Sequence, residues 1–169
     1  YLNETHSVNI EQIGKLFWMP FLAMGVSNML GGFLSDALFS KTNNLNLARK
    51  IIMFAATLLM FPVLFVRFAP SPESAILIMC IAFFAHGLWI TNYITSIADT
   101  FGRTIPSTVV GLSGTAGAVS AFVINPVIGL IITKFSYNPM WIYAGSMYLV
   151  AFIGFVIFIP KIKLLQTYG

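Results

Sequence analysis

The sequence predicts an all-α protein: a polytopic membrane helix bundle of about five transmembrane helices, forming a single domain over residues 1–169. Three observations support this fold class. Hydrophobic residues make up 58% of the chain and charged residues only 8%, whereas about 25% of a soluble domain is charged. The mean hydropathy is +0.88. The apolar residues also form five long runs, each long enough for the roughly 20 residues that cross a bilayer.

The five spans are expected at about residues 12–39, 48–68, 72–99, 107–135 and 139–160. Capping residues mark where they begin, because the first N–H groups of a helix need acceptors. Asn9 with Gln12 is typical of a capping box before the first span. Ser71 followed by Pro72, and Asn138 followed by Pro139, are typical starts for the third and fifth.

The distribution of basic residues predicts the orientation, because cytoplasmic loops retain Lys and Arg. One side would carry Lys41, Arg49, Lys50, Arg103, Lys161 and Lys163, and the other Lys15, Arg67 and Lys134. We therefore expect a multi-pass protein of the cell membrane (plasma or bacterial inner membrane) with a cytoplasmic C-terminus. The net charge of +4 comes from scattered residues, which suit anionic lipid headgroups rather than nucleic acid. An odd number of spans predicts a further helix before Tyr1.

Enzyme chemistry is not expected. Cys80 is the single cysteine and lies in an apolar run, so neither a disulfide framework nor a metal-ligand spacing is present. The spans also lack clustered carboxylates, a His/Asp constellation and a Ser/His pair. We expect no cofactor, no metal and no catalytic residue.

Polar residues within the spans are candidates for function, because polar groups at membrane depth are costly unless partnered or hydrated. In the third span, a helical repeat places five of them within about a third of the circumference: His86, Trp89, Asn92, Tyr93 and Ser96. His86 could bind a carboxylate or accept a proton, or it could form a structural hydrogen bond between helices. Trp89 could line a site or serve packing.

The first and fourth spans also carry mixed faces. Asn28 shares a face with Phe21, Gly25 and Gly32 in the first, and the fourth carries the strip Gly111, Gly114, Ala118, Ala121, Asn125 and Gly129. Small residues allow close helix approach, so packing competes with ligand contact here. Pro126 frees the carbonyl of Phe122 and predicts a kink or gating bend there. The second and fifth spans are almost wholly apolar and should lie outermost.

Five patterns in order carry a resemblance to a known family. They are Trp18-Met19-Pro20-Phe21-Leu22-Ala23; Gly31-Gly32 through Ser35-Asp36 with Ala48-Arg49-Lys50; His86 with Trp89 and Asn92; Ala98-Asp99-Thr100-Phe101; and Val110-Gly111-Leu112-Ser113-Gly114-Thr115-Ala116-Gly117. Together they resemble the anion:cation symporter family of the major facilitator superfamily, particularly hexuronate-transporter-like members. The resemblance covers nearly the whole chain.

The resemblance implies that the five spans are the eighth to twelfth helices of a twelve-helix transporter, with Tyr1-Leu2 ending the seventh. Gly32 to Asp36 resembles the Gly-x-x-x-Asp loop that stabilises the closed-inside state, although Asp36 could instead be a solvated helix-end carboxylate. Two positions depart from the family pattern: Gly87 stands where glutamine is common, and Gly25 where aspartate is common. These departures put the substrate in doubt.

The resulting hypothesis is a cation-coupled symporter, using a proton or sodium ion, for a small organic anion such as a hexuronate or sugar acid. It would work by alternating access with a missing N-terminal six-helix bundle and seventh helix. The expected substrate-binding residues are His86, Trp89, Asn92, Asn28, Asn125, Phe21 and Tyr93; the expected gating residues are Gly32, Asp36, Gly111, Gly114, Gly117 and Pro126. The alternative is a non-transporting membrane ligand sensor or scaffold.

Overall fold

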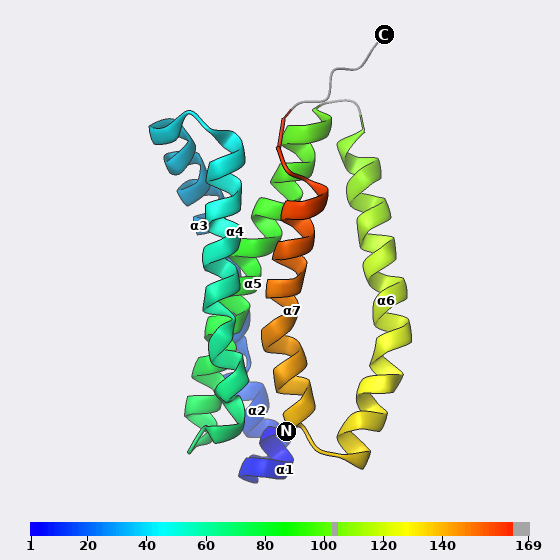
Figure 1. Ribbon diagram of the computed structural model, residues 1–169. Coiled ribbons are helices and arrows are strands. Elements are labelled where there is room, and N and C mark those ends of the chain that lie inside the picture. The colour runs from blue at the N-terminus through cyan, green and yellow to red at the C-terminus, as the bar shows by residue number, and fades with distance from the viewer. Residues whose placement is uncertain (103–104, 164–169) are drawn as a thin grey trace.

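A computed structural model describes residues 1–102 and 105–163, and every regular element in these ranges is helical (Figure 1). The elements are α1 (Leu2–His6), α2 (Ile10–Leu16), α3 (Trp18–Thr42), α4 (Leu45–Leu59), the 3-10 helix η1 (Phe61–Phe68), α5 (Pro72–Phe101), α6 (Pro106–Lys134) and α7 (Asn138–Phe158). Five stretches are long and apolar enough to cross a membrane: Glu11–Thr42, Leu45–Phe68, Pro72–Phe101, Pro106–Lys134 and Asn138–Phe158. The predicted all-α membrane bundle is confirmed.

The first span begins with the capping box that the sequence indicates. The Asn9 side chain accepts from the Gln12 N–H at 2.8 Å, and the Gln12 side chain accepts from the Asn9 N–H at 3.3 Å. The helix runs further than residue 39, because the hydroxyl of Thr42 donates to the carbonyl of Leu38 and Asn43 then ends it in the left-handed region, at φ 50°. Most of the loop expected after residue 39 is therefore helical.

The second span changes its helix type partway. It is α-helical as α4 and continues as η1, with Pro62 in the first turn of the 3-10 segment. Proline has no N–H to donate, and its ring clashes with the carbonyl four residues earlier, which is that of Leu58. The hydrogen-bond pattern of the span therefore changes from α-helical to 3-10 at this proline.

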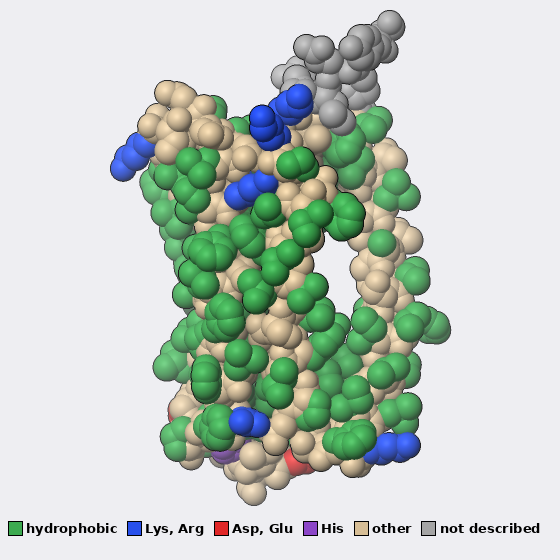
Figure 2. All heavy atoms as spheres, viewed as in Figure 1, with side chains coloured by type: hydrophobic (Ala, Val, Ile, Leu, Met, Phe, Trp, Pro, Cys, Tyr) green, Lys and Arg blue, Asp and Glu red, His purple; other side chains and the backbone are tan. Residues whose placement is uncertain are grey.

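Helices α3, α4, α5 and α7 pack together, whereas α6 lies beside them (Figure 1). None of the residues of α6 is buried. Figure 2 shows an opening between α6 and the rest of the bundle, and basic side chains near both ends of an apolar band. Arg103, which counted toward the predicted orientation, lies outside the described residues.

The helices expected outermost are not equally exposed. Helix α4 exposes Ile51, Phe54 and Leu58, yet it buries one face against its neighbours. The buried face consists of Ala48, Arg49, Met53, Ala56 and Thr57. Helix α4 is thus partly an interior helix. The sequence did not predict this, because an apolar residue can contact either lipid or another helix.

The small-residue strip of α6 has no partner among the described residues. A Cβ built on Gly111, Gly114, Gly117 or Gly129 would meet nothing within 4 Å. Helix α6 is also continuous through Pro126. Close approach of another helix to this strip, and a gating bend near Phe122, remain predictions.

The segment after α7 is fastened to the start of α4. The Lys50 ammonium donates to the carbonyls of Ile159, at 2.7 Å, and Pro160, at 2.8 Å. The Asn46 side chain accepts from the N–H of Ile162 at 3.0 Å, and the Ile162 side chain is buried. Two neighbouring positions of α4 therefore anchor the chain where it leaves the bundle.

We expect Lys50→Met to loosen this anchor, because methionine keeps the apolar stem and loses both donors. Hydrogen bonds to charged groups contribute about 1.5–3 kcal/mol, so amide hydrogen exchange at residues 159–163 should accelerate about tenfold or more. Lys41→Met, at an exposed position, is the control and should leave exchange unchanged. Equal exchange in both variants would show that the anchor contributes nothing.

Candidate functional site

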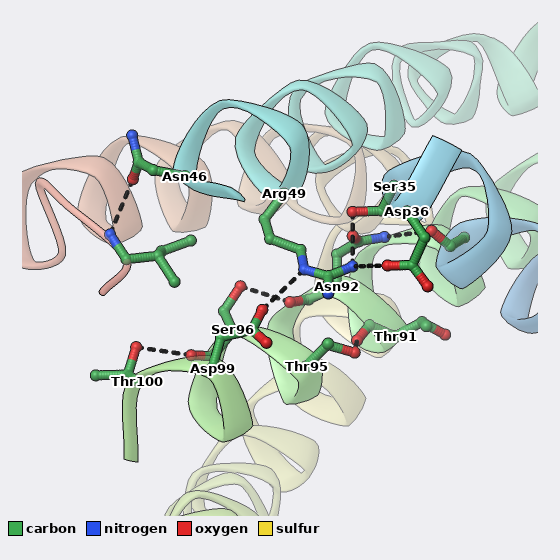
Figure 3. Close-up of polar contacts among 12 residues, drawn as sticks. Ser35, Asp36, Asn46, Arg49, Thr91, Asn92, Thr95, Ser96, Asp99 and Thr100 are labelled. Carbon is green, nitrogen blue, oxygen red and sulfur yellow. Dashed lines mark hydrogen bonds and ion pairs between the residues drawn. The ribbon is translucent and has the colours of Figure 1, made fainter. Parts of the chain in front are cut away.

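A buried arginine joins three helices near the end of the bundle where α3 meets α4 (Figure 3). The Arg49 guanidinium of α4 donates to the Asp99 carboxylate of α5 at 2.9 Å. It also donates to the Ser35 hydroxyl at 2.7 Å and the Asp36 carboxylate at 3.1 Å, both on α3. A buried charge is tolerated only with such partners.

The two carboxylates around Arg49 are not equivalent. The Asp99 side chain is 20% exposed and the Asp36 side chain 70% exposed, against 7% for Arg49. Asp99 is thus the interior partner of the guanidinium, and Asp36 is its exposed partner. Asp36 can exchange Arg49 for another cation or for water at little desolvation cost, whereas Asp99 cannot.

Sequence reasoning placed Asp36 among the gating residues, but it used Arg49 only for the orientation and for the family resemblance. Gly32 and Asp36 lie within α3, as the expected span 12–39 places them, and the structure adds Asp99, which completes the cluster. The available signal was weak. Arg49 and Asp99 are both charged positions at helix ends, and both occur in the patterns that carried the resemblance, but they are 50 residues apart.

Asn92 lines neither of the two cavities described below, and its place among the substrate-binding residues stays a prediction. Its side chain is fully buried. The amide donates to the Gly31 carbonyl of α3 at 3.1 Å and to the Leu88 carbonyl at 3.0 Å. Gly31 permits this approach, since a Cβ there would lie 3.3 Å from the Leu88 Cα. Asn92 therefore fastens α5 to α3.

His86 and Trp89 line a cavity of about 770 Å³ between α5 and α7, with contributions from α3, from η1 and from Met60, which lies between α4 and η1. A second cavity, of about 400 Å³, continues past the same two residues and past Tyr93. His86 Nδ1 is hydrogen-bonded to the Tyr148 hydroxyl of α7 at 2.5 Å. The Trp89 ring meets the Tyr148 ring edge-on, with centroids 5.5 Å apart. Tyr148 is a site residue that sequence reasoning missed, because nothing local marks it.

Tyr93 links α5 to α6. Its hydroxyl is hydrogen-bonded to the Ser113 hydroxyl at 2.6 Å. Both side chains line the smaller cavity. Tyr93 therefore shares a wall with His86 and Trp89, as the helical repeat predicts.

The other three expected substrate-binding residues lie apart from these cavities. Phe21 packs edge-on against Phe83, with ring centroids 5.2 Å apart. Asn28 accepts hydrogen bonds from the Thr91 hydroxyl at 3.3 Å, through its backbone and side-chain oxygens. Asn125 is exposed on α6. The structure brings together His86, Trp89 and Tyr93, and places the remaining candidates on other faces.

Both cavities have apolar walls. His86 is the one imidazole among their lining residues, and the lining includes no Asp, Glu, Lys or Arg. Within the described part of the chain, no group of three or more His, Cys, Asp or Glu could hold a metal ion. The cavities are therefore chemically suited to apolar groups with one hydrogen-bonding pair at mid-depth.

The larger cavity is bordered at one end by the first residues of the chain. The Tyr1 hydroxyl donates to the Val66 carbonyl at 3.0 Å, and its ring packs on Trp141 with centroids 5.1 Å apart. Nearby, the Tyr137 hydroxyl donates to the Glu4 carboxylate at 2.6 Å. This hydrogen bond, with burial and the Glu4 charge, raises the pKa of Tyr137. Tyr137 therefore stays a donor at neutral pH and ties α1 to the start of α7.

Comparison with known proteins gives a consistent result. The chain is 29% identical over 167 residues to the probable galactarate/D-glucarate transporter GudP of Escherichia coli K12, covering 98% of this chain and 37% of that protein. It is 27% identical over 143 residues to the hexuronate transporter of the same strain, covering 83% and 33%. It is 23% identical over 171 residues to the D-galactonate transporter of Escherichia coli O6:H1, covering 96% and 38%.

The chain thus spans about a third of the length of these relatives, which are named as transporters and not as enzymes. The family model of the Major Facilitator Superfamily matches residues 1–165. Together with the five apolar helices, this match makes the chain a multi-pass membrane protein. It belongs to the major facilitator superfamily, among relatives named for sugar acids.

Proposed function

We propose that this chain is part of a secondary transporter that carries a small organic acid of the sugar-acid class across the membrane. The observation that carries the proposal is the similarity, over 98% of the chain, to a protein named as a galactarate/D-glucarate transporter. Transport would be coupled to a proton or a sodium ion. The chain would work with the rest of a longer polypeptide, an N-terminal six-helix bundle and a seventh helix, by alternating access.

His86, Trp89 and Tyr93 are the proposed contribution of this chain to substrate binding. They are the members of the expected set that line the two cavities. When Tyr148 donates its hydroxyl proton to His86 Nδ1, the neutral imidazole carries its own proton on Nε2. An Nε2–H group can donate to a substrate carboxylate or hydroxyl, and the Trp89 ring can pack against the carbon chain. Asn28, Asn125 and Phe21 would belong to other parts of the transport path.

The Arg49 cluster is the proposed conformational element. It ties α3, α4 and α5 together, so these helices should move as one body when the transporter changes state. Asp36 is the exposed member and would exchange partners during the cycle. Gly32 and Asp36, with the glycines and Pro126 of α6, remain the proposed gating positions. The distribution of basic residues favours a cytoplasmic location for this end.

The test is uptake by the full-length protein in proteoliposomes, with galactarate, glucuronate and galactonate as substrates under an imposed proton or sodium gradient. We expect His86→Ala to lower uptake at least tenfold, because the substrate loses a donor that faces it. Cys80→Ala is the matched control, since Cys80 lies on the same helix and lines neither cavity.

Three outcomes would contradict parts of the proposal. Unaltered uptake by His86→Ala would remove His86 from the binding site. Uptake of neutral sugars alone would overturn the organic-acid substrate. Saturable binding of an acid without any accumulation under either gradient would favour the sensor alternative over a transporter.

A further inference from the structure

The segment after α7, residues 159–163, presents two lysines on one side. Ile162 is 4% exposed, and its N–H donates to the Asn46 side chain at 3.0 Å. Lys161 and Lys163, on either side of it, are both exposed. In a non-helical chain, side chains two positions apart point the same way and lie about 6–7 Å apart. The anchored Ile162 therefore turns both ammonium groups away from the bundle.

This end of the bundle carries positive charge without a countercharge. Lys161 and Lys163 take part in none of the ion pairs of the described residues. The nearby Lys50 ammonium donates to the carbonyls of Ile159 and Pro160, which are neutral partners and leave its charge in place. Figure 2 shows basic side chains, and no acidic side chain, where α7 ends on the face in view. The segment thus suits an anion.

The two lysines lie at the level of the lipid headgroups. The last turns of α7 expose large apolar side chains, with Ile153 at 49%, Ile157 at 65% and Phe158 at 85%. In a membrane protein, such surface contacts hydrocarbon. Lys161 follows Phe158 by three residues, which span at most about 10 Å. Each headgroup layer is about 5–7 Å thick, so the lysines reach this layer directly beyond the hydrocarbon.

Helix α4 offers an apolar surface below the lysines. Its exposed large side chains follow the spacing of one helix face: Leu47, Ile51, Phe54 and Leu58. We call these four residues the α4 stripe. The Phe54 ring packs on Phe152 of α7, with centroids 5.4 Å apart, so the stripe borders α7. The stripe is about 17 Å long, close to half of the roughly 30 Å hydrocarbon core and hence to the length of one acyl chain.

We propose that Lys161 and Lys163 bind the phosphate of an anionic phospholipid such as phosphatidylglycerol, with an acyl chain along the α4 stripe. The Lys50 charge adds to the attraction. An anionic membrane attracts each basic side chain at its surface about fivefold in binding constant, so the two lysines should favour an anionic over a zwitterionic headgroup about 30-fold. A nucleic acid or an acidic protein would not need the apolar stripe that continues from the lysines.

This lipid site goes beyond the proposed function and does not depend on the substrate. The bound phosphate would add to the hydrogen bonds of Asn46 and Lys50, which already hold this segment on α4. Anionic lipid should therefore stabilise the contact between the start of α4 and the end of α7.

Hydrogen exchange of the full-length protein in lipid nanodiscs tests the site. We expect amides 161–163 to exchange at least fivefold more slowly in nanodiscs with 30% phosphatidylglycerol than in nanodiscs of phosphatidylcholine alone. Lys161→Gln combined with Lys163→Gln should remove this lipid dependence. Both lysines are exposed, so in phosphatidylcholine the double variant should exchange as the wild type does. Salt at about 1 M should also remove the effect, because it screens exposed charges.

Lys41→Gln is the matched control, because Lys41 is exposed on α3 near the same end of the bundle. It should keep the full effect of phosphatidylglycerol. Slower exchange that persists in the double variant, or that is lost equally in Lys41→Gln, would overturn the site. Equal slowing by millimolar glycerol 3-phosphate in phosphatidylcholine nanodiscs would replace the lipid with a free phosphate and overturn the proposal as well.

Discussion

Replacing Arg49 with methionine is expected to destabilise the protein more than any other single change considered above. The substitution leaves the Asp99 carboxylate, 20% exposed, without its cation, and removes the link between α3, α4 and α5. Breaking a buried ion pair by removing one partner costs about 3–5 kcal/mol. We therefore expect a clearly lower unfolding temperature of the detergent-purified protein, and uptake reduced at least tenfold.

A double substitution separates charge from packing. Arg49→Met combined with Asp99→Asn removes the unpaired carboxylate, so the double variant should be more stable than Arg49→Met alone. Arg49→Lys should be intermediate, because an ammonium cannot reproduce the forked geometry in which Nε and Nη1 serve different partners. An Arg49→Met protein as stable as the wild type, or a double variant no better than the single, would show that the cluster does not hold the helices together.

Gly87→Ala is expected to give the second largest effect. A Cβ at this position would lie 1.8 Å from the Ser27 hydroxyl oxygen and 2.8 Å from the Met24 carbonyl oxygen, both on α3. The Ser27 hydroxyl already donates a hydrogen bond to that carbonyl, and the carbonyl belongs to a helix backbone. Moving either group away from the added Cβ would therefore cost free energy. Helices α3 and α5 must move apart, and overpacking of this kind costs about 1–3 kcal/mol or more.

Gly25→Ala provides the comparison for this prediction. Gly25 lies on α3, and a Cβ there would meet nothing within 4 Å. In detergent, the unfolding temperature should therefore be markedly lower for Gly87→Ala and not lower for Gly25→Ala, where alanine even favours the helix slightly. Equal unfolding temperatures for Gly87→Ala and the wild type would mean that α3 and α5 are not as closely packed as the structure describes.

Position 87 also explains one departure from the family pattern. The family's glutamine after the histidine suggested a polar group that the substrate site of this chain has lost, but residue 87 faces α3 and lines neither cavity. One step along a helix turns the side chain by about 100°, which carries position 87 away from the wall that His86 lines. In this chain, glycine at position 87 is explained by helix packing.

The fold was largely predictable from sequence because its determinants are local. Composition identifies the membrane class, and the capping box at Asn9 and the cap at Ser71 identify where helices begin. The change to 3-10 geometry at Pro62 was not anticipated, although proline was its visible cause. Helix ends shifted by a few residues where hydroxyl groups bonded back to helix carbonyls, as at Thr42.

The candidate site was predictable only in part. The polar residues of α5 cover about a third of the helix circumference. A face of this width can contact more than one neighbouring helix. His86, Trp89 and Tyr93 consequently face the cavities beside α7, while Asn92 turns into the contact with α3. A periodic pattern identifies a face of the helix, but it does not identify which residues of that face contact another helix and which line a cavity. Tyr148 and the pairing of Arg49 with Asp99 depend on contacts 62 and 50 residues apart, for which a single sequence holds no local signal.

The Arg49 cluster has a consequence for how the protein is made. Chains are synthesised from the amino end, and Asp36 precedes Arg49 by 13 residues whereas Asp99 follows it by 50. When α4 emerges from the ribosome and enters the bilayer, Arg49 already has a countercharge on α3. The α3–α4 hairpin can therefore be inserted as a partly neutralised pair, and the arrival of α5, bringing Asp99, completes the burial of the charge.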